Sequence, residues 1–169
     1  MRVKIVEREV LNPLAEVDVK KVKLNPIPRK IDVLSLVDNT KPNADLILDF
    51  ISKEINFKKL NKVNKPAGAP ASEKQIKNVQ ADLTILALGD CGSCTTWQIL
   101  DAIKLEKQGI STISVCSDIF APFARELAKS YGADQLKIVA VEHPIAGQSE
   151  DIIRNRVFLA MDNIKKMIN

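Results

Sequence analysis

The stretch Leu83-Thr-Ile-Leu-Ala-Leu-Gly-Asp-Cys-Gly-Ser-Cys94 decides the predicted fold. Its first six residues form the most continuously apolar run of the chain, which is typical of a strand buried on both faces of a parallel sheet. Residues 95–107 follow directly and place Trp97, Leu100 and Ile103 on one side of a predicted helix. A buried strand that turns at once into a helix is the repeating unit of α/β proteins.

The same alternation continues on both sides of this unit. Further strands are predicted at residues 31–37, 57–63, 112–116 and 136–141. Further helices are predicted after an N-cap at Asn43, near 72–79, along 120–131 with Phe120, Phe123 and Tyr131 in the core, and from about 149 onward. We therefore expect residues 31–169 to form a single α/β domain. Its architecture should be a three-layer sandwich with a mostly parallel five-stranded sheet, either flavodoxin-like or Rossmann-like.

Residues 1–30 are predicted to form an extended N-terminal arm. Pro13, Pro26 and Pro28 interrupt its short alternating runs, so these runs can be edge strands or lie on a neighbouring subunit, but not central strands. The arm holds eight Lys/Arg and four Asp/Glu, and therefore the whole net charge of +4. We interpret this excess as a solvated surface, and we expect any homo-oligomer to form through the arm.

Composition narrows the class of protein. No apolar run reaches the ~20 residues of a membrane span, and one Tyr, one Trp and no basic cluster among aromatics argue against nucleic acid. The first ten residues lack the apolar segment of a secretory signal, so we expect a cytoplasmic protein. Three cysteines in a reducing compartment indicate redox, catalytic or metal chemistry rather than a disulfide framework.

Polar and reactive residues collect where the predicted strands end. Ligands of open α/β sheets bind outside the carboxyl ends of the strands. We therefore expect all three cysteines and the only histidine to project toward one rim. The candidate residues at these ends are Asp38, Asn39, Lys41, Asn43, Asp90, Cys91, Cys94, Cys116, Ser117 and His143.

Cys91 and Cys94 are the central candidates for chemistry. A cysteine reacts as its thiolate, and the unpaired N–H groups and dipole at the start of a helix favour that form. Two intervening residues let a resolving thiol reach its partner, and Gly92 allows backbone to approach the sulfur or a substrate. Two packed cysteines at a strand end are the structural alternative.

The other candidates have supporting roles. His143 or Asp90 would move protons, and Lys41 with Asn43 would hold an anionic group beside a helix start. The remaining substrate-binding candidates are Asp38, Asn39, Gly92, Ser93, Thr95, Cys116 and Ser117. Zinc is an alternative, because Cys91, Cys94, Cys116 and His143 could form a Cys₃His set. Flavin binding is suggested by the fold alone, and the chain has no Walker-type loop and no GxGxxG.

Four segments resemble the UGSC family of (seleno)proteins, named for a selenocysteine-Gly-Ser-Cys motif. Here the motif reads Cys91-Gly-Ser-Cys94, and the resemblance continues through residues 36–45, 113–125 and 142–147. It implies that Cys91, at the position of the selenocysteine, is a nucleophile or redox centre, and it argues against zinc. Sulfur in place of selenium implies slower chemistry of the same type.

These observations predict a thiol-dependent oxidoreductase or related sulfur-chemistry enzyme. Cys91 would attack a small, anionic molecule and Cys94 would resolve the adduct, with a thiol reductant protein as partner and no resident cofactor. One rival is a cofactor-independent isomerase resembling the aspartate/glutamate racemases, which use two cysteines on opposing loops. The other is a zinc-binding or ligand-binding module without catalysis.

Overall fold

Five strands form one sheet in the computed structural model, which describes residues 19–168. All neighbouring strands are parallel, and their order across the sheet is β2-β1-β3-β4-β5. This is the flavodoxin-like order rather than the Rossmann order. The strands are β1 (Val33–Asp38), β2 (Lys59–Asn64), β3 (Leu83–Gly89), β4 (Ser111–Ser117) and β5 (Ile138–Val141).

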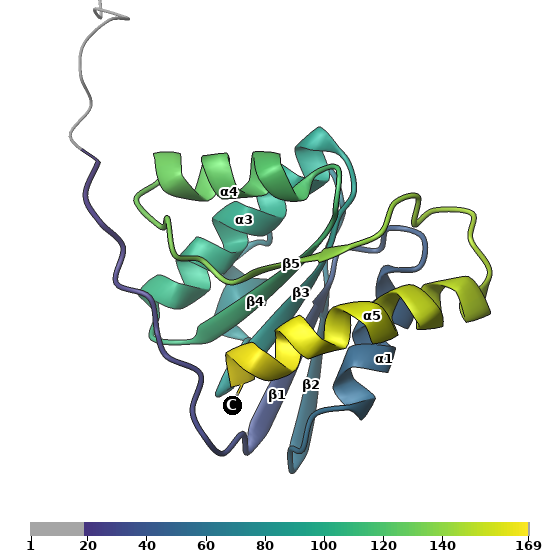
Figure 1. Ribbon diagram of the computed structural model, residues 1–169. Coiled ribbons are helices and arrows are strands. Elements are labelled where there is room, and N and C mark those ends of the chain that lie inside the picture. Colours follow the sequence, from purple (N-terminus) through teal and green to yellow (C-terminus); the bar gives the residue numbers. More distant parts are fainter. Residues whose placement is uncertain (1–18, 169) are drawn as a thin grey trace, which may run out of the picture.

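Helices cover both faces of this sheet and complete a three-layer sandwich (Figure 1). α1 and α5 pack on one face through Ile47, Ile51, Ile153 and Val157. α2, α3 and α4 lie on the other face, where alanines and Ile99 contribute to a second core. The helices are α1 (Ala44–Lys53), α2 (Glu73–Lys77), α3 (Gly92–Lys107), α4 (Ala121–Ser130) and α5 (Glu150–Ile168).

The end of β3 departs from regular strand geometry. Leu83, Ile85 and Ala87 face the core under α1 and α5, whereas Leu86 faces the opposite core. The register with β4 shifts between Ala87 and Gly89, and Leu88 joins the same core as Ala87. Gly89 is thereby pressed against β4, where an added Cβ would lie 2.6 Å from the Cys116 sulfur. Only glycine fits at this position.

The predicted elements are all present, with shifted ends. α3 begins at Gly92 instead of residue 95, because Cys91 is its N-cap. Asn43 does occupy the N-cap position of α1, but its side chain does not cap that helix. The amide instead donates to the carbonyls of Ile145 and Gln148, which ties the start of α1 to the loop after β5.

The prediction for the aromatic residues of α4 was wrong. Phe123 and Tyr131 are exposed, and Phe120 is partly buried at the N-cap position. The buried side of α4 is formed by Ala121, Ala124 and Ala128. The apolar stripe is wider than one contact face, so the helix can turn its alanine edge to the sheet, where small side chains allow close approach.

Residues 19–30 run along the domain without forming a helix or strand, at the side where α3 ends (Figure 1). The Val22 N–H donates to the Gly132 carbonyl, and Asn25 binds the Glu106 carboxylate through its backbone and side-chain N–H groups. This part of the predicted arm therefore packs on its own domain. Of the short alternating runs predicted in the arm, the one at residues 3–6 and the first half of the one at residues 17–20 lie outside the described residues. None of the helices described between residues 19 and 168 has the length and apolar character to cross a membrane.

Candidate active site

The candidate site lies between β1 and β3, where successive strands change from one side of the sheet to the other. From β1 the chain passes to β2 on one side, and β3 leads to β4 on the other. In open α/β sheets, ligand-binding crevices form at such a switch point, outside the carboxyl ends of the two strands. The loop after β1 and the turn between β3 and α3 meet there.

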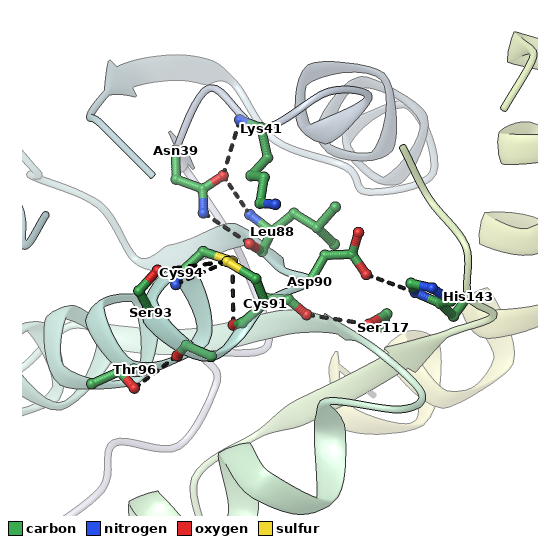
Figure 2. Close-up of a disulfide and its surroundings, with 12 residues drawn as sticks. Asn39, Lys41, Leu88, Asp90, Cys91, Ser93, Cys94, Thr96, Ser117 and His143 are labelled. Carbon is green, nitrogen blue, oxygen red and sulfur yellow. Dashed lines mark hydrogen bonds and ion pairs between the residues drawn. A yellow bond between two sulfur atoms is a disulfide. The ribbon is translucent and has the colours of Figure 1, made fainter. Parts of the chain in front are cut away.

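Cys91 and Cys94 occupy the first turn of α3, and their sulfur atoms form a disulfide (Figure 2). Their Cα atoms are 5.4 Å apart. The Cys94 N–H donates to the Cys91 sulfur over 3.3 Å, so the sulfur serves as the N-cap acceptor of the helix. The Ser93 hydroxyl lies 3.7 Å from the same sulfur. Two donors therefore face the Cys91 sulfur.

The two cysteines differ sharply in exposure. Cys91 is partly exposed, and Gly92 and Ser93 beside it are exposed. Cys94 is completely buried on the side of α3 that faces the sheet. A reagent from solvent therefore reaches the Cys91 sulfur first. The buried Cys94 sulfur can then react only with the sulfur of Cys91.

Asp90 and His143 form a pair beside the cysteines. The His143 Nδ1 atom lies 3.0 Å from an Asp90 carboxylate oxygen. The Asp90 side chain is 5% exposed and the His143 side chain 36% exposed, so the imidazole is the member that reaches solvent. Figure 2 shows the two side chains directed toward one another from opposite loops.

Asp118 positions this histidine, and sequence reasoning left it out of the candidate set. Its carboxylate accepts the backbone N–H of His143 over 3.1 Å and that of Ile119 over 2.8 Å. The signal for it was its place directly after the strand that ends with Cys116 and Ser117. Asp118 thus links the loop after β4 to the loop after β5, where His143 lies.

The loop after β1 is held by its own side chains. Asp38 accepts the Thr40 N–H over 2.6 Å, and Asn39 accepts the Lys41 N–H over 3.3 Å. Burial raises the pKa of the Asp38 carboxyl, and the Thr40 N–H acts against that shift. Lys41 is partly exposed, and within residues 19–168 its ammonium has no carboxylate at ion-pair distance.

A flavin phosphate does not fit this loop. Phosphates in such folds are bound by free backbone N–H groups. Here the N–H groups of Thr40 and Lys41 already pair with Asp38 and Asn39. The partly buried Asp38 carboxylate in the same loop would also carry the same charge as the phosphate.

Four predicted substrate-binding residues do not face the rim. Asn39, Thr95, Cys116 and Ser117 are buried, so the expectation that they contact a substrate is not met in this structure. Asn39 directs both polar atoms of its amide to the backbone of Leu88. Burial raises the pKa of the Cys116 thiol to about 12. The expectation that all three cysteines project to the rim is therefore wrong for Cys116.

The zinc and isomerase alternatives can be compared with the geometry of the cysteine pair. In the part of the chain that the structure describes, no three His, Cys, Asp or Glu side chains are grouped to hold a metal ion. Cys91 and Cys94 lie on one helical turn, whereas the two-cysteine isomerase needs thiols on opposite sides of its substrate. Asp90 does pair with His143, and it directly precedes Cys91 in the chain, with Gly92 and Ser93 exposed next to that cysteine.

These features define a flavodoxin-like α/β protein with a cysteine pair at the switch point of its sheet. The model of the UGSC family matches residues 9–169, and the chain belongs to this family. Among solved structures, a short-chain flavodoxin associated with a PDU bacterial microcompartment is similar, with 10% sequence identity and a TM-score of 0.43. That match covers 82% of this chain and 99% of the flavodoxin.

Proposed function

We propose that this protein is a thiol-dependent oxidoreductase that reduces a small, anionic, oxidised sulfur compound in the cytoplasm. The observation that carries the proposal is the unequal exposure of the cysteine pair. Cys91 is partly exposed at the start of α3, and Cys94 is buried one turn behind it. This is the arrangement that an attacking and a resolving thiol require.

In the first step, the Cys91 thiolate attacks one sulfur of a substrate disulfide. A Cys91–substrate disulfide forms, the substrate S–S bond breaks, and the leaving thiolate takes up a proton. The Cys94 N–H and the Ser93 hydroxyl both point to the Cys91 sulfur and favour its thiolate form. The dipole of α3 acts in the same direction.

In the second step, Cys94 gives up its proton and attacks the Cys91 sulfur. The Cys91–Cys94 disulfide forms and the second substrate thiol leaves, so two electrons have passed from the pair to the substrate. A thiol reductant protein then returns the pair to the dithiol by exchange at the exposed Cys91. The cycle requires no resident cofactor.

Proton movement is assigned to the Asp90–His143 pair. Asp90 is largely buried and bonded to Nδ1, so it can orient the imidazole and leave the other ring nitrogen for the leaving thiolate. Lys41, which has no carboxylate partner among the described residues, would attract the anionic group.

The decisive experiment traps the intermediate on the reduced protein. With 5,5′-dithiobis(2-nitrobenzoate) as an anionic disulfide probe, the wild type should release two thiols per chain as the pair closes. Cys94→Ser should release one and retain a mixed disulfide on Cys91, seen by mass spectrometry of peptides. Cys91→Ser should lose the fast phase. Fast labelling of Cys94 or Cys116 in Cys91→Ser would contradict the proposal.

Further variants test the supporting roles. His143→Asn should slow the first step about 10²-fold or more with an anionic alkyl disulfide such as oxidised glutathione, whose basic leaving thiolate needs a proton. Lys41→Ala should slow reaction with the anionic probe but not with neutral 4,4′-dithiodipyridine. Lys107→Ala, at the far end of α3, is the matched control. Deuterium exchange at the α-carbon of an amino acid would instead support the isomerase.

A further inference from the structure

The outward face of α5 carries large apolar side chains in an unusual position. Phe158 and Leu159 are 74% and 71% exposed, and Ile152 on the same side is 40% exposed. The opposite face of the helix is buried through Ile153, Val157, Ala160, Met161 and Ile164. In Figure 1, α5 forms the outermost layer on its side of the sheet.

Phe158 and Leu159 stand at the centre of α5, since the helix extends from Glu150 to Ile168. Large apolar side chains are unfavourably exposed to water here, and burying them against another surface would be favourable. A contact centred on these two residues would use the whole length of the helix.

The ends of this outward face carry opposite charges. Asp151 lies in the first turn of α5 and Lys166 in the last turn, and both are exposed. Neighbouring charges are already paired, namely Glu150 with Arg154, Arg156 with Glu142, and Lys165 with Glu54. Asp151 and Lys166 have no ion-pair partner within the described residues 19–168.

We propose that this face binds a second copy of the chain, with the two α5 helices antiparallel. A two-fold axis at the level between Phe158 and Leu159 packs each of these side chains against the same residue of the partner subunit. The same axis places Asp151 at the level of Lys166 of the partner subunit, because both lie about 11 Å from the axis along the helix. Asn155 then faces Asp162 of the partner subunit, so no like charges meet.

The residues on the outward face of α5 are self-complementary about the midpoint between Phe158 and Leu159. This symmetry favours a second copy of the chain over an unrelated partner. A two-fold interface uses the same patch on both subunits, so a residue and its complement must lie at equal distances from the axis. Asp151 and Lys166 meet this condition about the same point as Phe158 and Leu159. An unrelated partner would impose no such relation.

Sedimentation velocity over a concentration series tests the dimer. The wild type should associate reversibly, and Phe158→Glu should raise the dissociation constant about 100-fold or more, since it removes a central anchor from both subunits. Phe158 is mostly exposed in the single chain, so at concentrations where the wild type is monomeric the variant should have the same melting temperature. A wild type that stays monomeric throughout would overturn the proposal.

Charge reversal tests the antiparallel register. Asp151→Lys and Lys166→Asp alone should each weaken association about tenfold, because two symmetry-related pairs become repulsive. The double variant Asp151→Lys/Lys166→Asp should restore it. Lys107→Asp, on α3 at the other face of the sheet, is the control. A dimer that none of these variants changes, as an arm-mediated one would be, also overturns the proposal.

Discussion

Cys116 and Cys91 show how the same residue type acquires opposite chemistry. Cys116 is the second-last residue of β4, and its sulfur packs against Gly89 and is buried. Removal from water disfavours a thiolate, and this burial raises the pKa of Cys116 to about 12. Cys91 is partly exposed and receives hydrogen bonds from Cys94 and Ser93. The thiol of Cys116 should stay protonated while Cys91 reacts.

Stability at high pH should therefore depend on Cys116. Between pH 9 and 12 the folded protein keeps the Cys116 proton while the unfolded chain loses it, so the free energy of unfolding falls as pH rises. At pH 10 this amounts to about 1.4 kcal/mol. Urea unfolding at pH 8 and pH 10 measures the effect, with Cys91 and Cys94 replaced by serine. In that background, Cys116→Ala should remove the part of the fall in unfolding free energy between pH 8 and pH 10 that comes from Cys116. An unchanged pH dependence would refute the assignment.

Among the elements, β1 and β3 are joined at their ends by Asn39. Its side-chain amide donates to the Leu88 carbonyl over 2.8 Å and accepts the Leu88 N–H over 2.9 Å. The Asn39 N–H also donates to the Ala87 carbonyl. These bonds satisfy backbone groups at the point where β3 leaves its register with β4. They hold the residues that lead directly to Cys91.

Asn39→Ala should therefore affect both stability and the site. The change leaves the buried N–H and carbonyl of Leu88 without the amide, which should lower the free energy of unfolding by about 2–4 kcal/mol. We expect slower reaction of Cys91 with a disulfide probe, because the turn before α3 loses its support. Urea unfolding and stopped-flow thiol release measure the two effects. Asn61→Ala, at the edge strand β2, should change each of them little.

Across the whole molecule, buried charges connect separate parts of the chain. Lys65, after β2, forms an ion pair of 2.6 Å with Asp101 of α3, and both side chains are buried. Asp101 also accepts the Ala71 N–H over 2.8 Å. Five residues further along α3, the buried Glu106 binds Asn25, Thr112 and Lys137. The second half of α3 is thus tied to the segment after β2 through Asp101 and to residues 19–30 through Glu106.

Breaking the Lys65–Asp101 pair should be costly. Asp101→Asn leaves a buried ammonium without its carboxylate, and we expect the free energy of unfolding to fall by about 3–5 kcal/mol. Chemical denaturation at neutral pH checks this value. Asp49→Asn disrupts the exposed pair with Lys53 and should cost less than about 1 kcal/mol. Equal losses in the two variants would show that burial does not set the effect.

Much of the fold and part of the site could be predicted from local patterns. Apolar runs located β1, β3, β4 and β5, and a weaker pattern located β2. The helical spacing of Ile153, Val157 and Ile164 located the buried face of α5. The rotation of α4 could not be predicted, since phenylalanine, tyrosine and alanine are all apolar and only packing against the sheet selects the alanine edge. The prediction that Cys91 starts a helix is confirmed, because a turn after a strand is a local feature.

The sequence by itself determined the alternation of strands and helices and the place of the cysteine pair, because periodicity and helix capping act between residues close in the chain. Only the tertiary structure decided the strand order that brings the β1 loop beside β3. It also decided which side chains are sealed, and the contact between Asp90 and His143, which are 53 residues apart. Those features arise from packing between distant segments of the chain, and no local pattern of residues specifies that packing.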